Sequence, residues 1–303
     1  MNTAKEFIGL TAVVPARNGC NLRCAGCIID QRKEGAVTVL SDEDYLHFFE
    51  EAMKLPEVTW FGLQGYEPLL PESWALSKEL MSMSLRHELV TSCITNGVYL
   101  DRYASEILDV SHNLYVSIDS HDPVIHDMSR GVQGAWSDTL RGVRRVQAEF
   151  GDKNQFGEYL YVASILYPGK AKRLLGIPKM LAELGVKYWG ITPFVALKKK
   201  GYANPEKVRD DMILLDEEAK KYGVMMTLSD ELRMLEHVGD IYHKFIIATL
   251  EKDHTVTRLS PDAGYSIGKE IVGANSPRFW DRVQSPSNFV RESHKEYRAN
   301  NPR

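Results

Sequence analysis

The amino-acid sequence predicts an α/β protein, a partial (β/α)6 barrel followed by a small C-terminal cap. Short apolar, β-branched runs alternate with amphipathic segments, which is the pattern of a parallel sheet with helices outside it. Six such units are too few for an eight-fold barrel. The predicted strands are 7–14, 58–63, 89–95, 114–118, 159–166 and 186–191, and the predicted helices are 41–54, 71–84, 101–108, 135–150 and 172–184.

Cap signals support two of these helices. Ser41 and the acidic residues after it form a helix start, and Gly185 provides a helix end. After about residue 205 the pattern changes, so we predict a barrel over 1–204 and a cap over 205–303. The predicted cap contains helices at 208–222 and 229–244, then a hairpin whose strands 255–259 and 265–271 flank a turn at 260–264.

The composition is that of an ordinary globular protein, with 303 residues of which 44% are hydrophobic and 26% charged. A net charge of −4 provides no basic field, so a nucleic-acid partner is not expected. The chain has no apolar run of about 18 residues and no signal-peptide pattern. We therefore expect no membrane partner and a cytoplasmic location. The composition does not indicate an oligomeric state.

Three of the four cysteines lie within eight residues, at Cys20, Cys24 and Cys27, directly after the first predicted strand. Loops at the carboxyl ends of parallel strands build the active sites of α/β barrels. Three thiolates can bind three irons of a four-iron cluster and leave the fourth iron open. Zinc is the main alternative, but structural zinc needs four ligands and no fourth Cys or His lies close by in the sequence.

The Cys-x3-Cys-x2-Cys spacing after a first strand resembles the radical S-adenosylmethionine (SAM) superfamily. The resemblance implies one 4Fe–4S cluster held by Cys20, Cys24 and Cys27, with SAM bound to the open iron. It also implies a radical SAM barrel and reductive cleavage of SAM to methionine and a 5′-deoxyadenosyl radical. Flavodoxin or ferredoxin would donate the electron.

Further segments resemble this family in the family's order, over roughly residues 7–195. Gly65-Tyr66-Glu67-Pro68 resembles the Gly-Gly-Glu-Pro element that binds the SAM amino group, and residues 94–97 resemble its Thr-Asn-Gly. Residues 116–120, with His126-Asp127 and Arg130-Gly131, resemble the fourth-strand region of a subfamily rich in maturases. The SAM-binding residues that this implies are Gly65, Tyr66, Glu67, Asn96, Ser117, Asp119, Arg130 and Ile191.

Their chemistry suggests individual roles. Asn96, Ser117 and Asp119 suit ribose hydroxyls, and Arg130 suits the methionine carboxylate. The family usually has an aromatic residue where this chain has Gly26, so adenine is expected on Ile28 or around residues 190–192, which is why Ile191 is included. Tyr66 replaces the second glycine of Gly-Gly-Glu-Pro.

The last third of the chain lacks cysteines. Residues 258–265 resemble the hairpin that begins the cysteine-rich extension, called SPASM or twitch, of related maturases. No cysteine follows Cys93, so we expect no auxiliary cluster. The hairpin is then interpreted as a cap over the barrel mouth that contributes to the substrate pocket.

Cys93 is the one spare thiol. A lone cysteine in a strand is usually a small buried hydrophobe. The alternative is that Cys93 donates a hydrogen atom to a substrate radical, as cysteines do in some radical SAM epimerases, with Tyr265 as a second candidate donor.

Three functions follow from this pattern. The first is hydrogen abstraction from a small natural-product substrate, such as a sugar or aminocyclitol, leading to epimerisation, dehydrogenation or C–C bond formation. The second is a maturase that acts on a ribosomal peptide and binds its leader through a winged-helix domain or an exposed strand edge. The third is a non-catalytic iron–sulfur or zinc-binding module.

Overall fold

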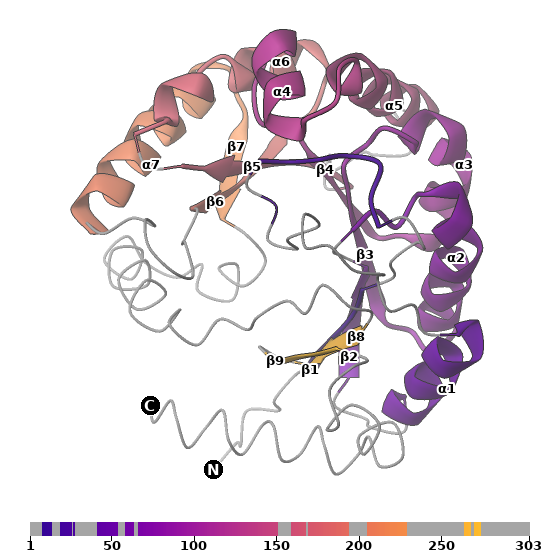
Figure 1. Cartoon of the computed structure of the whole chain (residues 1–303). Coiled ribbons are helices and arrows are strands. Elements are labelled where there is room, and N and C mark those ends of the chain that lie inside the picture. The colour runs from indigo at the N-terminus through magenta and orange to yellow at the C-terminus, as the bar shows by residue number, and fades with distance from the viewer. Residues whose placement is uncertain are drawn as a thin grey trace, which may run out of the picture. The chain divides into compact units, whose positions relative to one another are not determined.

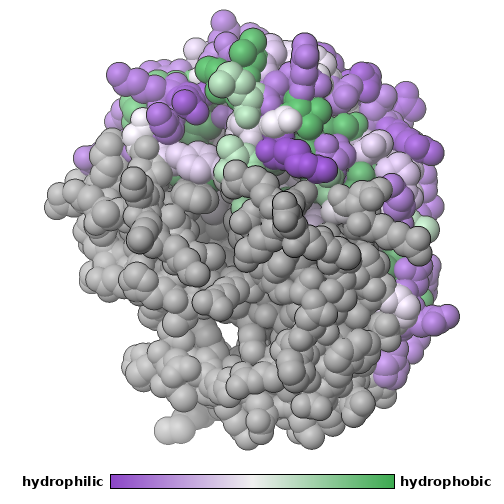
Figure 2. All heavy atoms as spheres, in the orientation of Figure 1, coloured by the Kyte–Doolittle hydropathy of each residue, from purple (hydrophilic) through white to green (hydrophobic). Residues whose placement is uncertain are grey.

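The fold forms two compact units. Unit 1 is Met1–Thr95, Glu106–His112 and Thr257–Arg303, and unit 2 is Asn96–Ser105 with Asn113–Val256. The computed structural model describes residues 8–13, 19–25, 27, 41–53, 58–63, 66–150, 159–167, 169–193, 205–228, 264–267 and 270–273. None of the helices in these ranges is long and apolar enough to cross a membrane. Among the described residues visible in Figure 2, hydrophilic ones predominate and hydrophobic ones lie scattered between them.

Unit 1 contains strands in the order β3-β2-β1-β8-β9. The first three run parallel, and β8 and β9 are antiparallel to their neighbours. The strands are β1 (Ile8–Val13), β2 (Val58–Leu63), β3 (Val90–Thr95), β8 (Gly264–Ile267) and β9 (Glu270–Gly273), and the helices are α1 (Asp42–Ala52) and α2 (Pro71–Arg86).

Unit 2 contains four parallel strands in the order β7-β6-β5-β4, with helices on one side of them (Figure 1). The strands are β4 (Asn113–Ser117), β5 (Leu160–Leu166), β6 (Tyr188–Pro193) and β7 (Met225–Leu228). The helices are α4 (Pro123–Arg130), α5 (Ala135–Phe150), the 3-10 turn η1 (Ala171–Arg173), α6 (Ile177–Glu183) and α7 (Pro205–Lys221). Helix α3 (Leu100–Val110) has residues in both units.

The predicted α/β alternation is confirmed, and the structure adds two elements. Helix α4 is one: Asp122 caps it by accepting from the Val124 and Ile125 N–H groups, and Gly131 ends it in a left-handed conformation. Strand β7 is the other, and it pairs parallel with β6. The alternation therefore continues past the predicted boundary at residue 205.

The single strand predicted over 265–271 is divided in the structure. Strands β8 and β9 both fall within the range 264–273, whereas one strand was expected over 265–271. Strand β8 pairs with β1, with Tyr265 opposite Ala12, so this hairpin extends the sheet of unit 1. The predicted strand 255–259 and helix 229–244 lie outside the described residues.

The two faces of the sheet in unit 2 differ in what they contact. A side-chain carbon added to Gly97 would lie 2.8 Å from both Val116 Cγ1 and Thr139 Cγ2 of α5, so Val116 is on the face that α5 covers. Paired residues of parallel strands share a face, which places Val162 and Trp189 there too. The opposite face carries a row of three tyrosines in ring contact. Tyr115 stacks on Tyr161 with ring centroids 4.8 Å apart, and Tyr188 lies tilted against Tyr161 at 5.0 Å.

A close approach of α5 to the start of α3 makes Gly142 necessary. A Cβ on Gly142 would lie 2.6 Å from Leu100 Cβ and 3.0 Å from the Asp101 backbone nitrogen. Neither atom is the end of a flexible side chain, so the helices would have to separate.

We predict that Gly142→Ala lowers the free energy of unfolding by about 1–3 kcal/mol because it overpacks this contact. In an open helix the same change would be stabilising by about 1 kcal/mol, so the sign is diagnostic. Urea unfolding measures the difference, with the exposed Arg144→Ala on the same helix as control. A Gly142→Ala protein as stable as the natural chain would contradict the close contact.

Candidate functional site

The cysteine loop of unit 1 folds back on its own backbone. The Cys27 N–H donates to the Cys24 carbonyl at 3.2 Å, and Arg23 Nη1 donates to the carbonyls of Cys20 (2.6 Å) and Leu22 (2.8 Å). Leu22 is buried and anchors the loop. Cys20 is buried, Cys24 and Cys27 are half-buried, and all three are free thiols.

The donor chemistry of this loop fits an iron–sulfur cluster, because thiolates are the usual ligands of iron in such clusters. Its geometry is not that of an assembled site. In the described part of the chain no group of three or more His, Cys, Asp or Glu side chains is arranged to hold a metal ion.

Glu67 anchors the turn that follows β2. Its carboxylate is fully buried, and Oε1 accepts from the Thr95 hydroxyl at 2.6 Å and from the Leu69 N–H at 3.0 Å. Glu67 thus ties this turn to the end of β3. Tyr66 has φ +46°, in the left-handed region that favours glycine, which explains why the family element has glycine there. Gly65 lies outside the described residues.

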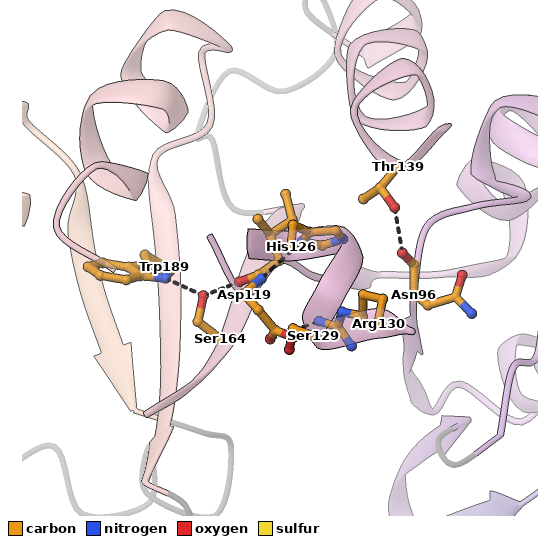
Figure 3. Close-up of polar contacts among 9 residues, drawn as sticks. Asn96, Asp119, His126, Ser129, Arg130, Thr139, Ser164 and Trp189 are labelled. Atoms are coloured by element: carbon orange, nitrogen blue, oxygen red, sulfur yellow. Dashed lines mark hydrogen bonds and ion pairs between the residues drawn. The ribbon is translucent and has the colours of Figure 1, made fainter. Parts of the chain in front are cut away.

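Asn96 shapes the turn after β3. Its Oδ1 accepts from the Val98 N–H at 2.9 Å, and its backbone carbonyl accepts from the Thr139 hydroxyl at 2.9 Å (Figure 3). Gly97, between them, has φ +83°. The Asn96 side chain therefore has a structural role in the turn besides its predicted contact with ribose.

Two of the predicted SAM-binding residues contact each other. Arg130 Nη2 lies 3.0 Å from Asp119 Oδ1, with 9% and 11% of the two side chains exposed (Figure 3). The Ser129 hydroxyl donates to Asp119 Oδ2 at 2.6 Å. Asp119 follows β4, on which Ser117 is half-buried on the tyrosine face. The structure thus brings Asp119 and Arg130 together as a buried ion pair.

His126 belongs to the same cluster, although no role was predicted for it from the sequence. Residues 126, 129 and 130 share one face of α4 through i, i+3 and i+4 spacing. His126 is 1% exposed, and its Nδ1 accepts from the Asp119 N–H at 3.3 Å. Burial and the charge of Arg130 lower the pKa of His126 from 6.5 to about 4, against the opposing effect of Asp119 and Asp127. The imidazole is therefore neutral near pH 7.

A second polar contact, which the sequence did not predict, fixes the strand ends. Ser164 on β5 donates its hydroxyl to the Ile118 carbonyl and accepts from Trp189 Nε1 at 2.9 Å (Figure 3). Ser164 and Ile191 are register partners and lie on the face that α5 covers. The Ile191 side chain is fully buried there. The Ile191 side chain thus lies on the face opposite Ser117, and the adenine contact expected around residues 190–192 stays a prediction.

The structure also places Cys93 in the core. Its side chain is 0% exposed, and burial, together with the charge of Glu67, raises the pKa of its thiol. Cys93 shares a face of β3 with Thr91, whose hydroxyl donates to the Val110 carbonyl at the end of α3. The side chain therefore faces the helices, which supports the interpretation as a small buried hydrophobe over that of a hydrogen donor. The side chain of Tyr265 lies outside the described residues.

Comparisons with known proteins point to one superfamily. The Radical SAM superfamily model matches residues 14–162. The chain is 28% identical over 149 residues to the PqqA peptide cyclase of Granulibacter bethesdensis, a match that covers 48% of this chain and 38% of the relative. It is 30% identical over 128 residues to the AdoMet-dependent heme synthase of Methanosarcina barkeri, covering 41% and 35%. The matches thus span little more than a third of these curated relatives.

The fold is similar to that of Streptococcus suis SuiB bound to its precursor peptide SuiA, with a TM-score of 0.58 and 11% identity over 74% of this chain and 49% of SuiB. This likeness confirms the predicted partial-barrel fold class. The family match contains the cysteine loop and the segments that resemble SAM-binding elements. Residues 14–162 of the chain are a radical SAM domain, of a superfamily of enzymes that use a 4Fe–4S cluster and S-adenosylmethionine.

Proposed function

We propose that this chain provides the radical SAM domain of an enzyme that abstracts hydrogen from a residue of a ribosomally made peptide. The observation that carries the radical chemistry is the family match over residues 14–162, which includes all four cysteines. The similarity to PqqA peptide cyclase supports a peptide substrate. A peptide was the second of the functions expected from the sequence, and it has more support than the sugar or aminocyclitol substrate that we expected first.

In this proposal Cys20, Cys24 and Cys27 hold the cluster as thiolates. When bound, the cluster supplies the electron that cleaves SAM into methionine and a 5′-deoxyadenosyl radical. The loop contributes its three donors and its closed backbone, in which Arg23 donates to the carbonyls of Cys20 and Leu22. Thiols and a reduced cluster need a reducing compartment, so we place the protein in the cytoplasm with flavodoxin or ferredoxin as its electron donor.

The residues proposed to bind SAM lie on turns and a helix that hydrogen bonds hold in place within each unit. The turn after Tyr66 is anchored by Glu67 and offers backbone carbonyls to the ammonium group. A guanidinium carries five N–H donors in a fork, so Arg130 can pair with Asp119 and with the methionine carboxylate together. Asn96 and Ser117 would contact the ribose hydroxyls.

A strand edge suits a peptide substrate. Within the described residues β9 pairs with β8 alone and ends the strand order of unit 1. An extended peptide can add to such an edge through backbone hydrogen bonds. The heme synthase relative keeps a small molecule as the second candidate substrate.

Isotope transfer distinguishes these substrates. Hydrogen abstraction moves a substrate hydrogen onto 5′-deoxyadenosine, so deuterated peptides encoded beside the gene should yield deuterated 5′-deoxyadenosine. Mass spectrometry of the nucleoside measures this, with deuterated sugars and aminocyclitols in parallel. Label from a sugar alone would restore the small-molecule function, and no 5′-deoxyadenosine under any condition would favour a non-catalytic metal-binding module.

The cysteines provide a matched test of the cluster. Replacing Cys20, Cys24 or Cys27 with Ala should abolish the broad visible absorbance of the reconstituted protein and its formation of 5′-deoxyadenosine. Cys93→Ala is the control. Because this thiol is buried in the core, its removal should leave the absorbance and the formation of 5′-deoxyadenosine unchanged. A triple variant that still cleaves SAM would refute the ligand assignment.

The role of Arg130 requires a variant that leaves no buried charge unpaired. Removing one partner of a buried pair costs about 3–5 kcal/mol of stability, so Asp119→Asn and Arg130→Gln are combined. If the guanidinium binds the SAM carboxylate, the double variant should bind SAM more weakly by about 1.5–3 kcal/mol. Equilibrium dialysis measures the affinity.

The exposed pair Asp138–Arg141, 2.8 Å apart on α5, is the control for that experiment. Asp138→Asn with Arg141→Gln should bind SAM as the natural chain does. Natural affinity in the Asp119/Arg130 double variant would show that the ion pair is structural, and the proposed carboxylate contact would be withdrawn.

A further inference from the structure

The α4 cluster contains a histidine whose protonation state follows from its geometry. The Asp119 backbone N–H can only donate, so His126 Nδ1 must be the acceptor at 3.3 Å. A neutral imidazole with a lone pair on Nδ1 carries its proton on Nε2. Among the described residues Nε2 is buried and has no hydrogen-bond partner. The contact with Asp119 is therefore the polar contact by which this ring is held.

The same residue, Asp119, takes part in this contact through its backbone and in the ion pair through its side chain. The Asp119 N–H is held by His126, and the Asp119 carboxylate faces Ser129 and Arg130. All three partners come from one face of α4, so this helix contacts both the backbone and the side chain of Asp119 after the end of β4. A shift of the Asp119 backbone would move the carboxylate that holds Arg130.

We propose that His126 is a positioning residue, which as a neutral hydrogen-bond acceptor holds Asp119 so that Arg130 is aimed at its ligand. This inference deepens the proposed function, because the ligand of Arg130 is the SAM carboxylate. Asp127 does not compete for this role, since its two carboxylate oxygens accept from the Gly134 and Trp136 N–H groups at the start of α5.

Protonation would reverse the role of His126. An imidazolium has donors at both nitrogens, so it cannot accept from Asp119, and its charge would stand beside Arg130. The charged groups that face the imidazole are Arg130, Asp119 and Asp127. Burial and the charge of Arg130 lower its pKa by more than the two carboxylates raise it. The ordinary pKa of 6.5 applies to the unfolded chain and about 4 to the folded one. Stability from the neutral ring is therefore complete above pH 6.5 and is lost as the pH falls toward 4.

Two substitutions separate the nitrogens. The Asn side-chain oxygen takes the place of Nδ1, whereas the Gln amide takes the place of Nε2. His126→Asn should therefore keep the affinity for SAM within about threefold of the natural chain, and His126→Gln should lose at least about tenfold, as measured by equilibrium dialysis of the reconstituted protein at pH 7.5. Equal losses in both variants, or loss in Asn alone, would overturn the proposal.

The second measurement does not use SAM. At pH 6.5, unfolding of the natural chain should take up about half a proton more than unfolding of His126→Asn, and at pH 5 nearly one proton more. Near pH 5 the folded-to-unfolded ratio of the natural chain should therefore change almost tenfold more per pH unit. Val124→Ala, an exposed site on α4 without a titratable side chain, is the control and should leave the slope unchanged. An unchanged slope in His126→Asn would overturn the neutral ring, even if the Gln variant does not fold.

These outcomes differ from a failure of the proposed function. If Arg130 does not bind SAM, the Asp119/Arg130 double variant keeps its affinity while the pH slope still depends on His126. If His126 is not a positioning residue, the double variant loses affinity while His126→Gln does not.

Discussion

The structure of unit 2 depends on keeping two opposite charges buried together at the end of β4. Taking a carboxylate and a guanidinium out of water costs several kcal/mol for each ion, and their attraction offsets this only with good geometry and further hydrogen bonds. Asp119 and Arg130 meet both conditions, with a 3.0 Å contact and a 2.6 Å bond from Ser129. Leaving either charge alone would be strongly destabilising, so the surrounding elements have to hold the pair in place.

Helix α4 holds this ion pair in place, and its eight residues are enough to do so. Asp122 begins it, Gly131 ends it, and the eight residues between present His126, Ser129 and Arg130 on one face. Val124 and Met128, on the other side, are exposed. Asp127 links the helix to the start of α5, and α5 packs closely on α3 through Gly142. The caps of α4, its helical spacing and the close packing of α5 on α3 thus position the Arg130 guanidinium beside Asp119.

The sequence predicted the strand–helix alternation well, because hydrophobic period and caps are local properties. Strand β2 lies where it was predicted, at Val58–Leu63. Helix α4 was not predicted, and of its eight residues only Arg130 had been given a role, as a SAM ligand. Strand β7 has four residues, too few for a period, and the partner of β8 is set by long-range pairing with β1.

The candidate site was predictable by residue type and less so by contact. The family resemblance brought attention to Glu67, Asp119 and Arg130, yet only the structure shows that Glu67 anchors a turn and that the other two bind each other. The faces of Ile191 and Cys93 depended on register, which a sequence does not specify.

The central claim is that three cysteines leave one iron open to SAM. Electron–nuclear double resonance of the reduced, reconstituted protein with SAM labelled with nitrogen-15 in its amino group tests it directly: the account predicts coupling between the cluster and that nitrogen, and a fully loaded cluster without such coupling would contradict it.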